Sequence, residues 1–154
     1  MDGNSSAKDS ARNHFAAIFQ DAKDLSRNLA DLPGMLEALK KGGWKCYISS
    51  LHYLSIGVMG GSYDLYSSLS SSLATQATMA RAVEVRKAAN EVHDGILGLV
   101  KDFRKTPPEG WGKIMPSVGK ILVSVEALQE HLVQLGEVGN ISRQGWVTVS
   151  HYED

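Results

Sequence analysis

Cysteine is almost absent from this chain, since Cys46 is the only one. One cysteine cannot form a disulfide within a chain, so a disulfide-stapled secreted scaffold is excluded. No stretch of about 18 residues is apolar enough to predict a transmembrane helix, and residues 1–9 lack the apolar core of a secretory signal. These absences together predict an intracellular, cytoplasmic protein.

An excess of charge of one sign is also missing. The 154 residues carry 16 basic and 17 acidic side chains, a formal net charge of −1. A protein that binds the phosphate backbone of nucleic acids usually offers a strongly basic surface. We therefore expect no nucleic-acid partner.

The motifs that mark catalytic and metal sites are lacking as well. Gly119-Lys120 resembles the end of a phosphate-binding loop, but Ile114 and Ile121 stand where that motif requires glycine and a hydroxyl residue. No serine lies in a Gly-x-Ser-x-Gly elbow. The five histidines do not form a helical pair four residues apart, and none follows a glutamate at the spacing of a di-iron bundle: His14, His52, His93, His131 and His151. We expect a non-enzymatic protein without cofactor or metal.

What the chain does have is helical periodicity. The apolar residues of the first segment recur at steps of three and four, which is typical of a helix that buries one side: Phe15, Ile18, Ala22, Leu25, Leu29 and Leu32. The pattern predicts a helix over 10–31 after a flexible lead, residues 1–9. Pro33 is predicted to end this helix, and a short helix should follow over 34–41, up to Gly42 and Gly43.

The middle of the chain predicts two further helices. One should run from Trp44 to Met59 and end at Gly60 and Gly61. The other falls within 62–105, which contains no proline. An unbroken helix of that length would measure about 65 Å, whereas a compact domain of this size is about 40 Å across. We therefore expect a protruding end, or a break at 70–72 or at 95–98, where helix propensity is poor.

The last part of the chain predicts a loop, a fourth main helix and an extended tail. Prolines and glycines predict the loop at 106–112, and the helix should begin near Pro116 and stop at Gly136 or Gly139. Residues 145–152 alternate like a strand. The predicted fold is all-α, an antiparallel up-down bundle of four main helices plus one short helix. The bundle should cover residues 10–139, and 140–154 should form a tail or the start of a following module, as if the chain were one part of a longer protein.

Charge is scarcest between Cys46 and Ala80, where Asp64 is the only formally charged residue among 35. Nine serines make this segment too polar for an ordinary membrane span. Three interpretations remain open: a hairpin packed between other helices, a surface for a protein partner, or a face that enters lipid.

Our leading functional hypothesis is an adaptor or assembly domain that binds a protein partner, or a second copy of itself, through helical faces. The candidate contact residues are Ser68 and Ala77, which are small, and Trp111 and Trp146, because tryptophan often anchors interfaces. Trp44 is instead expected to close one end of the bundle. The alternative is a membrane-active bundle that exposes 46–80 to lipid, which the serines disfavour; a small enzyme or ligand carrier is a third, weaker hypothesis.

Overall fold

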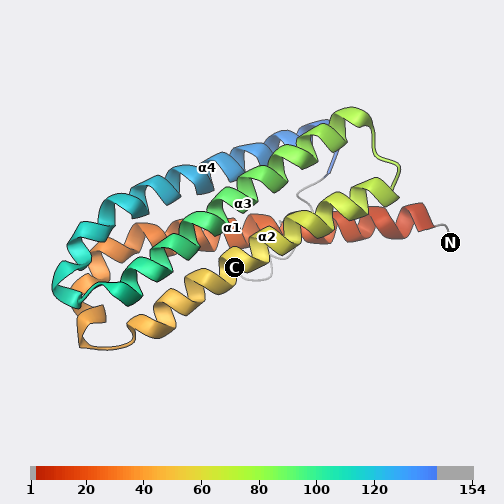
Figure 1. Cartoon of the computed structure of the whole chain (residues 1–154). Coiled ribbons are helices and arrows are strands. Elements are labelled where there is room, and N and C mark those ends of the chain that lie inside the picture. The colour runs from red at the N-terminus through yellow and green to blue at the C-terminus, as the bar shows by residue number, and fades with distance from the viewer. Residues whose placement is uncertain (1–2, 142–154) are drawn as a thin grey trace.

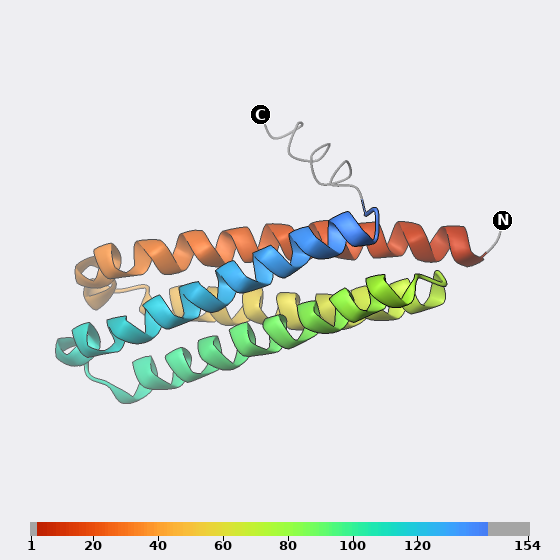
Figure 2. The ribbon, with the colours of Figure 1, turned by 90° about the horizontal axis from the view of Figure 1, so that it is seen from above.

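A computed structural model describes residues 3–141 as four long antiparallel α-helices (Figures 1 and 2). They are α1 (Gly3–Lys41), α2 (Trp44–Ser71), α3 (Gln76–Lys105) and α4 (Met115–Val138). A short 3₁₀-helix, η1 (Pro108–Ile114), precedes α4. The prediction of an all-α up-down bundle is confirmed. The predicted strand at 145–152 lies outside the described residues.

The bundle is elongated rather than round. Each helix packs against the next one in the chain, and α4 closes the arrangement by packing against α1. Helix α1 has 39 residues, which corresponds to about 58 Å at 1.5 Å per residue. A width of about 40 Å, expected for a compact chain of this length, therefore underestimates the long axis. Figure 2 shows the helices side by side along this axis.

Helix α1 is longer than predicted at both ends. Residues 3–9, assigned to a flexible lead, belong to the helix, and Pro33 lies inside it rather than at its end. The prediction of a separate short helix at 34–41 is therefore wrong. A proline removes one backbone hydrogen bond, but the buried Leu39 and the partly buried Met35 beyond it keep the helix attached to the core. The helix ends only at Gly42 and Gly43, whose φ angles are 157° and 85°.

Helix α2 continues through the glycines that were predicted to end it. The reason is close packing against α1. A Cβ on Gly57 would lie 2.8 Å from the carboxyl Oδ2 of Asp21, and a Cβ on Gly61 would lie 3.0 Å from Cγ1 of Ile18. Glycine at these two positions lets the helices approach, and the packing offsets its low helix propensity.

The break after α2 is where the serine run predicted it. Ser72 caps the helix and donates a hydrogen bond to the carbonyl of Leu69 at 2.8 Å. Leu73 follows in the left-handed conformation, with φ 60°, and is 83% exposed. Thr75 then caps α3 by accepting a hydrogen bond from the backbone N–H of Thr78 at 3.2 Å.

The alternative break at 95–98 does not occur. A Cβ on Gly95 would lie 3.0 Å from Cγ1 of Ile121, so this glycine lets α3 and α4 cross closely. The predicted loop at 106–112 is only partly correct, because 108–114 forms η1. Pro116 lies in the first turn of α4, as predicted.

The apolar pattern predicted for the first helix forms the core together with a matching stripe of α4. Phe15, Ile18, Leu25 and Leu29 of α1 are fully or almost fully buried. The matching residues of α4 are also buried: Val118, Ile121, Val125, Leu128, Leu132 and Leu135. The bundle is therefore held together by burial of these apolar stripes.

Candidate interaction surface

The structure does not bring the four predicted contact residues together. Ser68 and Ala77 lie at the end of the bundle that holds the α2–α3 connection, and Trp111 lies in η1 at the opposite end (Figure 1). Ser68 is partly buried and donates a hydrogen bond to the Ser10 hydroxyl at 3.1 Å, so it joins α2 to α1. Ala77 is exposed. Trp146 lies outside the described residues.

Trp111, predicted as a partner contact, is a core residue of the folded domain. It is 1% exposed. Its indole N–H donates a hydrogen bond to the carbonyl of Thr106 at 3.1 Å, and its ring lies 5.2 Å from that of Phe103. The ring of Trp44 lies 5.8 Å from that of Trp111, edge to face. Both tryptophans therefore close one end of the bundle. This role was expected for Trp44 but not for Trp111.

An uncharged apolar stripe runs along the outer side of α2. Six exposed residues recur at alternating steps of three and four and form what we call the neutral face: Cys46, Ser49, Tyr53, Ile56, Gly60 and Tyr63. Three of them are large and apolar. Tyr53 is 78% exposed, Ile56 is 45% exposed and Tyr63 is 57% exposed. Large apolar side chains that gather on one exposed helix face mark candidate interaction sites.

The same helix carries a second stripe that explains its place in the bundle. Leu51, Val58, Leu65 and Leu69 are buried against the other helices. The buried Ser55 and Ser62 each donate to a carbonyl of the preceding turn, at 2.7 Å, and so satisfy their hydroxyls locally. The inner stripe therefore accounts for folding, and the neutral face is not needed for it.

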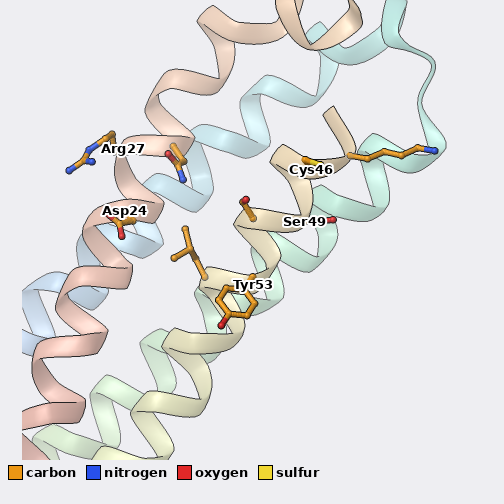
Figure 3. Close-up of a pocket in the computed structure, with 9 residues that line it drawn as sticks. Asp24, Arg27, Cys46, Ser49 and Tyr53 are labelled. Carbon is orange, nitrogen blue, oxygen red and sulfur yellow. The ribbon is translucent and has the colours of Figure 1, made fainter. Parts of the chain in front are cut away.

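A hollow of about 860 Å³ lies at one end of the neutral face, between α1 and α2. Figure 3 shows Asp24 and Arg27 on one helix and Cys46, Ser49 and Tyr53 on the other. Its other lining residues are Asn28, Lys45, Ser50 and Leu54. The hollow is open to solvent and adjoins three residues of the neutral face, so the two form one continuous surface.

Two titratable groups stand near the boundary between α1 and α2. Burial, and after it the nearby Asp24 carboxylate, raises the pKa of Asp21. Burial, followed by the negative charge of Asp31, raises the pKa of Tyr47, whose hydroxyl donates a hydrogen bond to the carbonyl of Asn28. This hydrogen bond fixes the start of α2 against α1 beside the hollow.

Cationic side chains border the neutral face. The Arg86 guanidinium of α3 lies 5.0 Å from the centre of the Tyr63 ring and 5.2 Å from that of Tyr66. The Lys45 ammonium lies 5.7 Å from the centre of the Trp44 ring. Such contacts orient the aromatic rings, and Arg86 holds Tyr63 in place at the end of the face.

The hollow contains few groups that could react with a ligand or hold a metal ion. Cys46 is exposed, and it is the only thiol of the chain. Elsewhere on α2, the ring of His52 lies 6.0 Å from that of His93 on α3. Within residues 3–141, no group of three or more histidine, cysteine or carboxylate side chains is placed to hold a metal ion. The arrangement offers contact area and hydrogen-bonding hydroxyls to a ligand.

Tyr53, Ile56 and Tyr63 were not predicted as contact residues, although the sequence contains their helical spacing. The segment holds two interleaved stripes with helical spacing, and only one of them can face the core. The predicted break at Gly60 and Gly61 hid this, because it divided the second stripe between two elements. In an unbroken helix, the stripe that does not face the core is the exposed one, and this stripe is the neutral face.

No helix among the described residues combines the length and apolarity needed to cross a bilayer. Comparisons of the chain with protein-family models, with curated proteins and with solved structures find no match.

Proposed function

We propose that this domain is a non-enzymatic protein-interaction module, of the adaptor or assembly kind, and that it binds its partner through the neutral face of α2. The observation that carries the proposal is the exposure of Tyr53, Ile56 and Tyr63 in a stripe whose six positions carry no formal charge. Aromatic side chains are enriched at protein interfaces and often supply much of their binding energy.

The neighbouring hollow supports the same proposal. It offers an open concave region beside Tyr53, and its walls carry Asp24, Arg27 and Lys45. Interfaces typically combine a central apolar patch with a polar, solvent-accessible rim. The neutral face and the charged residues around it have this arrangement.

Insertion of the charge-poor segment 46–80 into lipid is less favoured. Its apolar residues Leu51, Val58, Leu65 and Leu69 lie in the core, so insertion requires the bundle to open first. Each buried leucine contributes about 2 kcal/mol to folding. The folded domain should therefore remain in the supernatant when sedimented with neutral or anionic vesicles, and pelleting of most of the protein would favour the membrane hypothesis.

A charge placed on the neutral face tests the proposal. Ile56→Lys should abolish binding, because the interface would have to bury an unpaired ammonium. The matched control is Val123→Lys on α4, where the wild-type valine is 65% exposed but lies on another helix. Proteins captured by the immobilised wild-type domain should be retained by Val123→Lys and lost by Ile56→Lys. Binding of a captured, purified protein is then measured by titration, and equal affinity for all three domains would contradict the proposal.

A further inference from the structure

We infer that the neutral face binds a second copy of this chain, with the two α2 helices antiparallel. This inference rests on the proposed function, because it assigns a partner to the same surface. Four observations support it: the symmetry of the stripe, the placement of the two charges of α2, an unexplained glycine, and the fit of the end of the stripe to the hollow.

The stripe is symmetric about its centre. Its steps from Cys46 to Tyr63 are three, four, three, four and three, so they read the same in both directions. An antiparallel copy therefore places Tyr53 against Ile56 of the copy, Ser49 against Gly60 and Cys46 against Tyr63. Each of these pairs joins a larger residue to a smaller one, which suits interdigitation of two helices.

The charges of α2 follow the same symmetry. Lys45 and Asp64 are its only formally charged residues, and they lie equally far from the centre of the stripe. An antiparallel copy brings the Lys45 end of one helix to the Asp64 end of the other. A parallel copy brings like charges to the same level, which is unfavourable. Arg86 of α3 adds a positive charge beside Tyr63 and Asp64 in either orientation, so the preference for the antiparallel copy comes from Lys45 and Asp64.

Packing within the chain does not require a glycine at position 60, nor at the exposed Gly98 of α3, but Gly60 lies on the neutral face. Gly57 and Gly61 are packed against α1, but a Cβ on Gly60 would meet no atom within 4 Å. Glycine inside a helix costs about 1 kcal/mol relative to alanine. Gly60 lies between Ile56 and Tyr63 on the exposed stripe, where a residue without a side chain lets a second helix approach closely.

The hollow receives the end of the stripe. In the antiparallel register the Tyr63 ring of one copy lies against Cys46 of the other, at the edge of the hollow lined by Cys46, Ser49 and Tyr53. The stripe covers 18 residues, or about 27 Å of helix. Two such stripes form an interface smaller than the roughly 800 Å² per partner of stable complexes. The dimer should therefore be weak and depend on concentration.

The single native thiol allows a direct test of the register. Tyr63→Cys places a second thiol opposite Cys46 of the copy, within the about 7 Å between Cα atoms that a disulfide requires. In wild-type protein the two Cys46 residues would lie about 26 Å apart along the helices, since position 63 is 17 positions after position 46. Under mild oxidation, Tyr63→Cys should give at least tenfold more covalent dimer than wild type.

Ser70→Cys is the matched control for this cross-link. It adds an exposed thiol on the same side of α2, seven residues from the position that faces Cys46, or about 10 Å out of register. It should cross-link no more than wild type. Efficient cross-linking of the wild-type protein through Cys46 would instead show a parallel pair, and equal dimer yields from Tyr63→Cys and Ser70→Cys would contradict the register.

Sedimentation velocity tests self-association without cross-linking. The wild-type sedimentation coefficient should rise with concentration, and Ile56→Lys should remain monomeric. Gly60→Ala should raise the melting temperature of the monomer and yet weaken association at least fivefold. Gly98→Ala on α3 is its control, because that glycine is also exposed and open: it should raise the melting temperature and leave association unchanged.

The outcomes separate this inference from the proposed function. A wild-type protein that stays monomeric at every concentration, with no cross-linking in Tyr63→Cys, would overturn the second copy as partner. The interaction function would survive that result if Ile56→Lys still abolished binding of a different purified protein. If Ile56→Lys still self-associated and still bound the other purified protein, both the inference and the proposed function would be overturned.

Discussion

The outer sides of α2 and α3 differ in charge although the two helices are otherwise alike. Both bury a continuous apolar stripe, and both expose a stripe with helical spacing. On α3 the exposed stripe is charged at four of five positions: Lys87, Glu91, Asp94, Gly98 and Lys101. On α2 the neutral face carries no formal charge at any of its six positions. A shared fold therefore does not dictate the outer side, and α3 has the surface expected of a helix that faces water.

The largest expected effect comes from introducing a charge at a buried position, compared with introducing one at an exposed position. Leu25→Asp should cost more than about 4 kcal/mol of the free energy of unfolding, because Leu25 is fully buried and its replacement leaves a carboxylate unpaired in the core. Leu128→Asp should behave alike. Tyr53→Asp on the neutral face should change the free energy of unfolding by less than about 0.5 kcal/mol. Thermal melts followed by circular dichroism measure all three, and a Leu25→Asp domain as stable as wild type would refute the core assignment.

A smaller effect is expected at the closed end of the bundle. Trp111→Ala should cost about 3–5 kcal/mol, as large-to-small changes of buried aromatic residues do. The ring is 1% exposed and packs on Phe103 and Trp44. Trp44→Ala should cost less, because Trp44 is only partly buried. Urea unfolding of the two variants compares them; equal losses would mean that Trp111 does not fill the end of the core.

Two adjacent glycines of α2 sharpen the comparison within one helix. Gly61→Leu should cost about 1–3 kcal/mol by overpacking, because its Cβ would stand 3.0 Å from Ile18. Gly60→Leu should not destabilise the monomer, since nothing lies within 4 Å and leucine has the better helix propensity. Denaturant midpoints at low protein concentration decide this, and a reversed order would contradict the packing of α2 on α1.

The smallest effect concerns Asp21, whose pKa is raised by burial and then by Asp24. A raised pKa means that the folded state binds this proton more readily, so stability falls as the pH rises through that pKa. Asp21→Asn should therefore stabilise the domain at pH 7, by at most about 1 kcal/mol because solvent screens a half-exposed carboxyl. The gain should vanish below about pH 4. Melting temperatures across pH 3–7 test it, and a gain that grows on acidification would give the wrong sign.

The helix count, the up-down order and the core could be predicted from the sequence because they depend on local periodicity. Leu25 was identified from its spacing alone. The errors occurred where tertiary contacts override local propensity. Pro33 remains inside α1 because Leu39 beyond it is held in the core, and Gly61 remains inside α2 because Ile18 occupies the space of its missing side chain. Neither contact is visible in the sequence.

The candidate surface was predicted less well than the fold. Its main property, the scarcity of charge between 46 and 80, could be predicted from the sequence. Ser68 was predicted in the helix after a break at Gly60 and Gly61, whereas it lies in α2. Trp111 was predicted from its residue type, yet burial depends on neighbours such as Phe103 that only the folded chain brings together. Tyr53 was not predicted, because the rotation of α2 about its own axis decides which of its two stripes faces outward.

The order in which the helices pack bears on how the chain folds. Three of the four helix–helix interfaces join helices that are consecutive in the chain, and only the contact between α1 and α4 closes a long loop. Chains dominated by such local contacts fold within microseconds to milliseconds. The hairpin of α1 and α2 can form before α3 and α4 are in place, because the connection through Gly42 and Gly43 is short. During synthesis, the neutral face would then be presented early, while the inner side of the same hairpin still awaits the second half of the bundle.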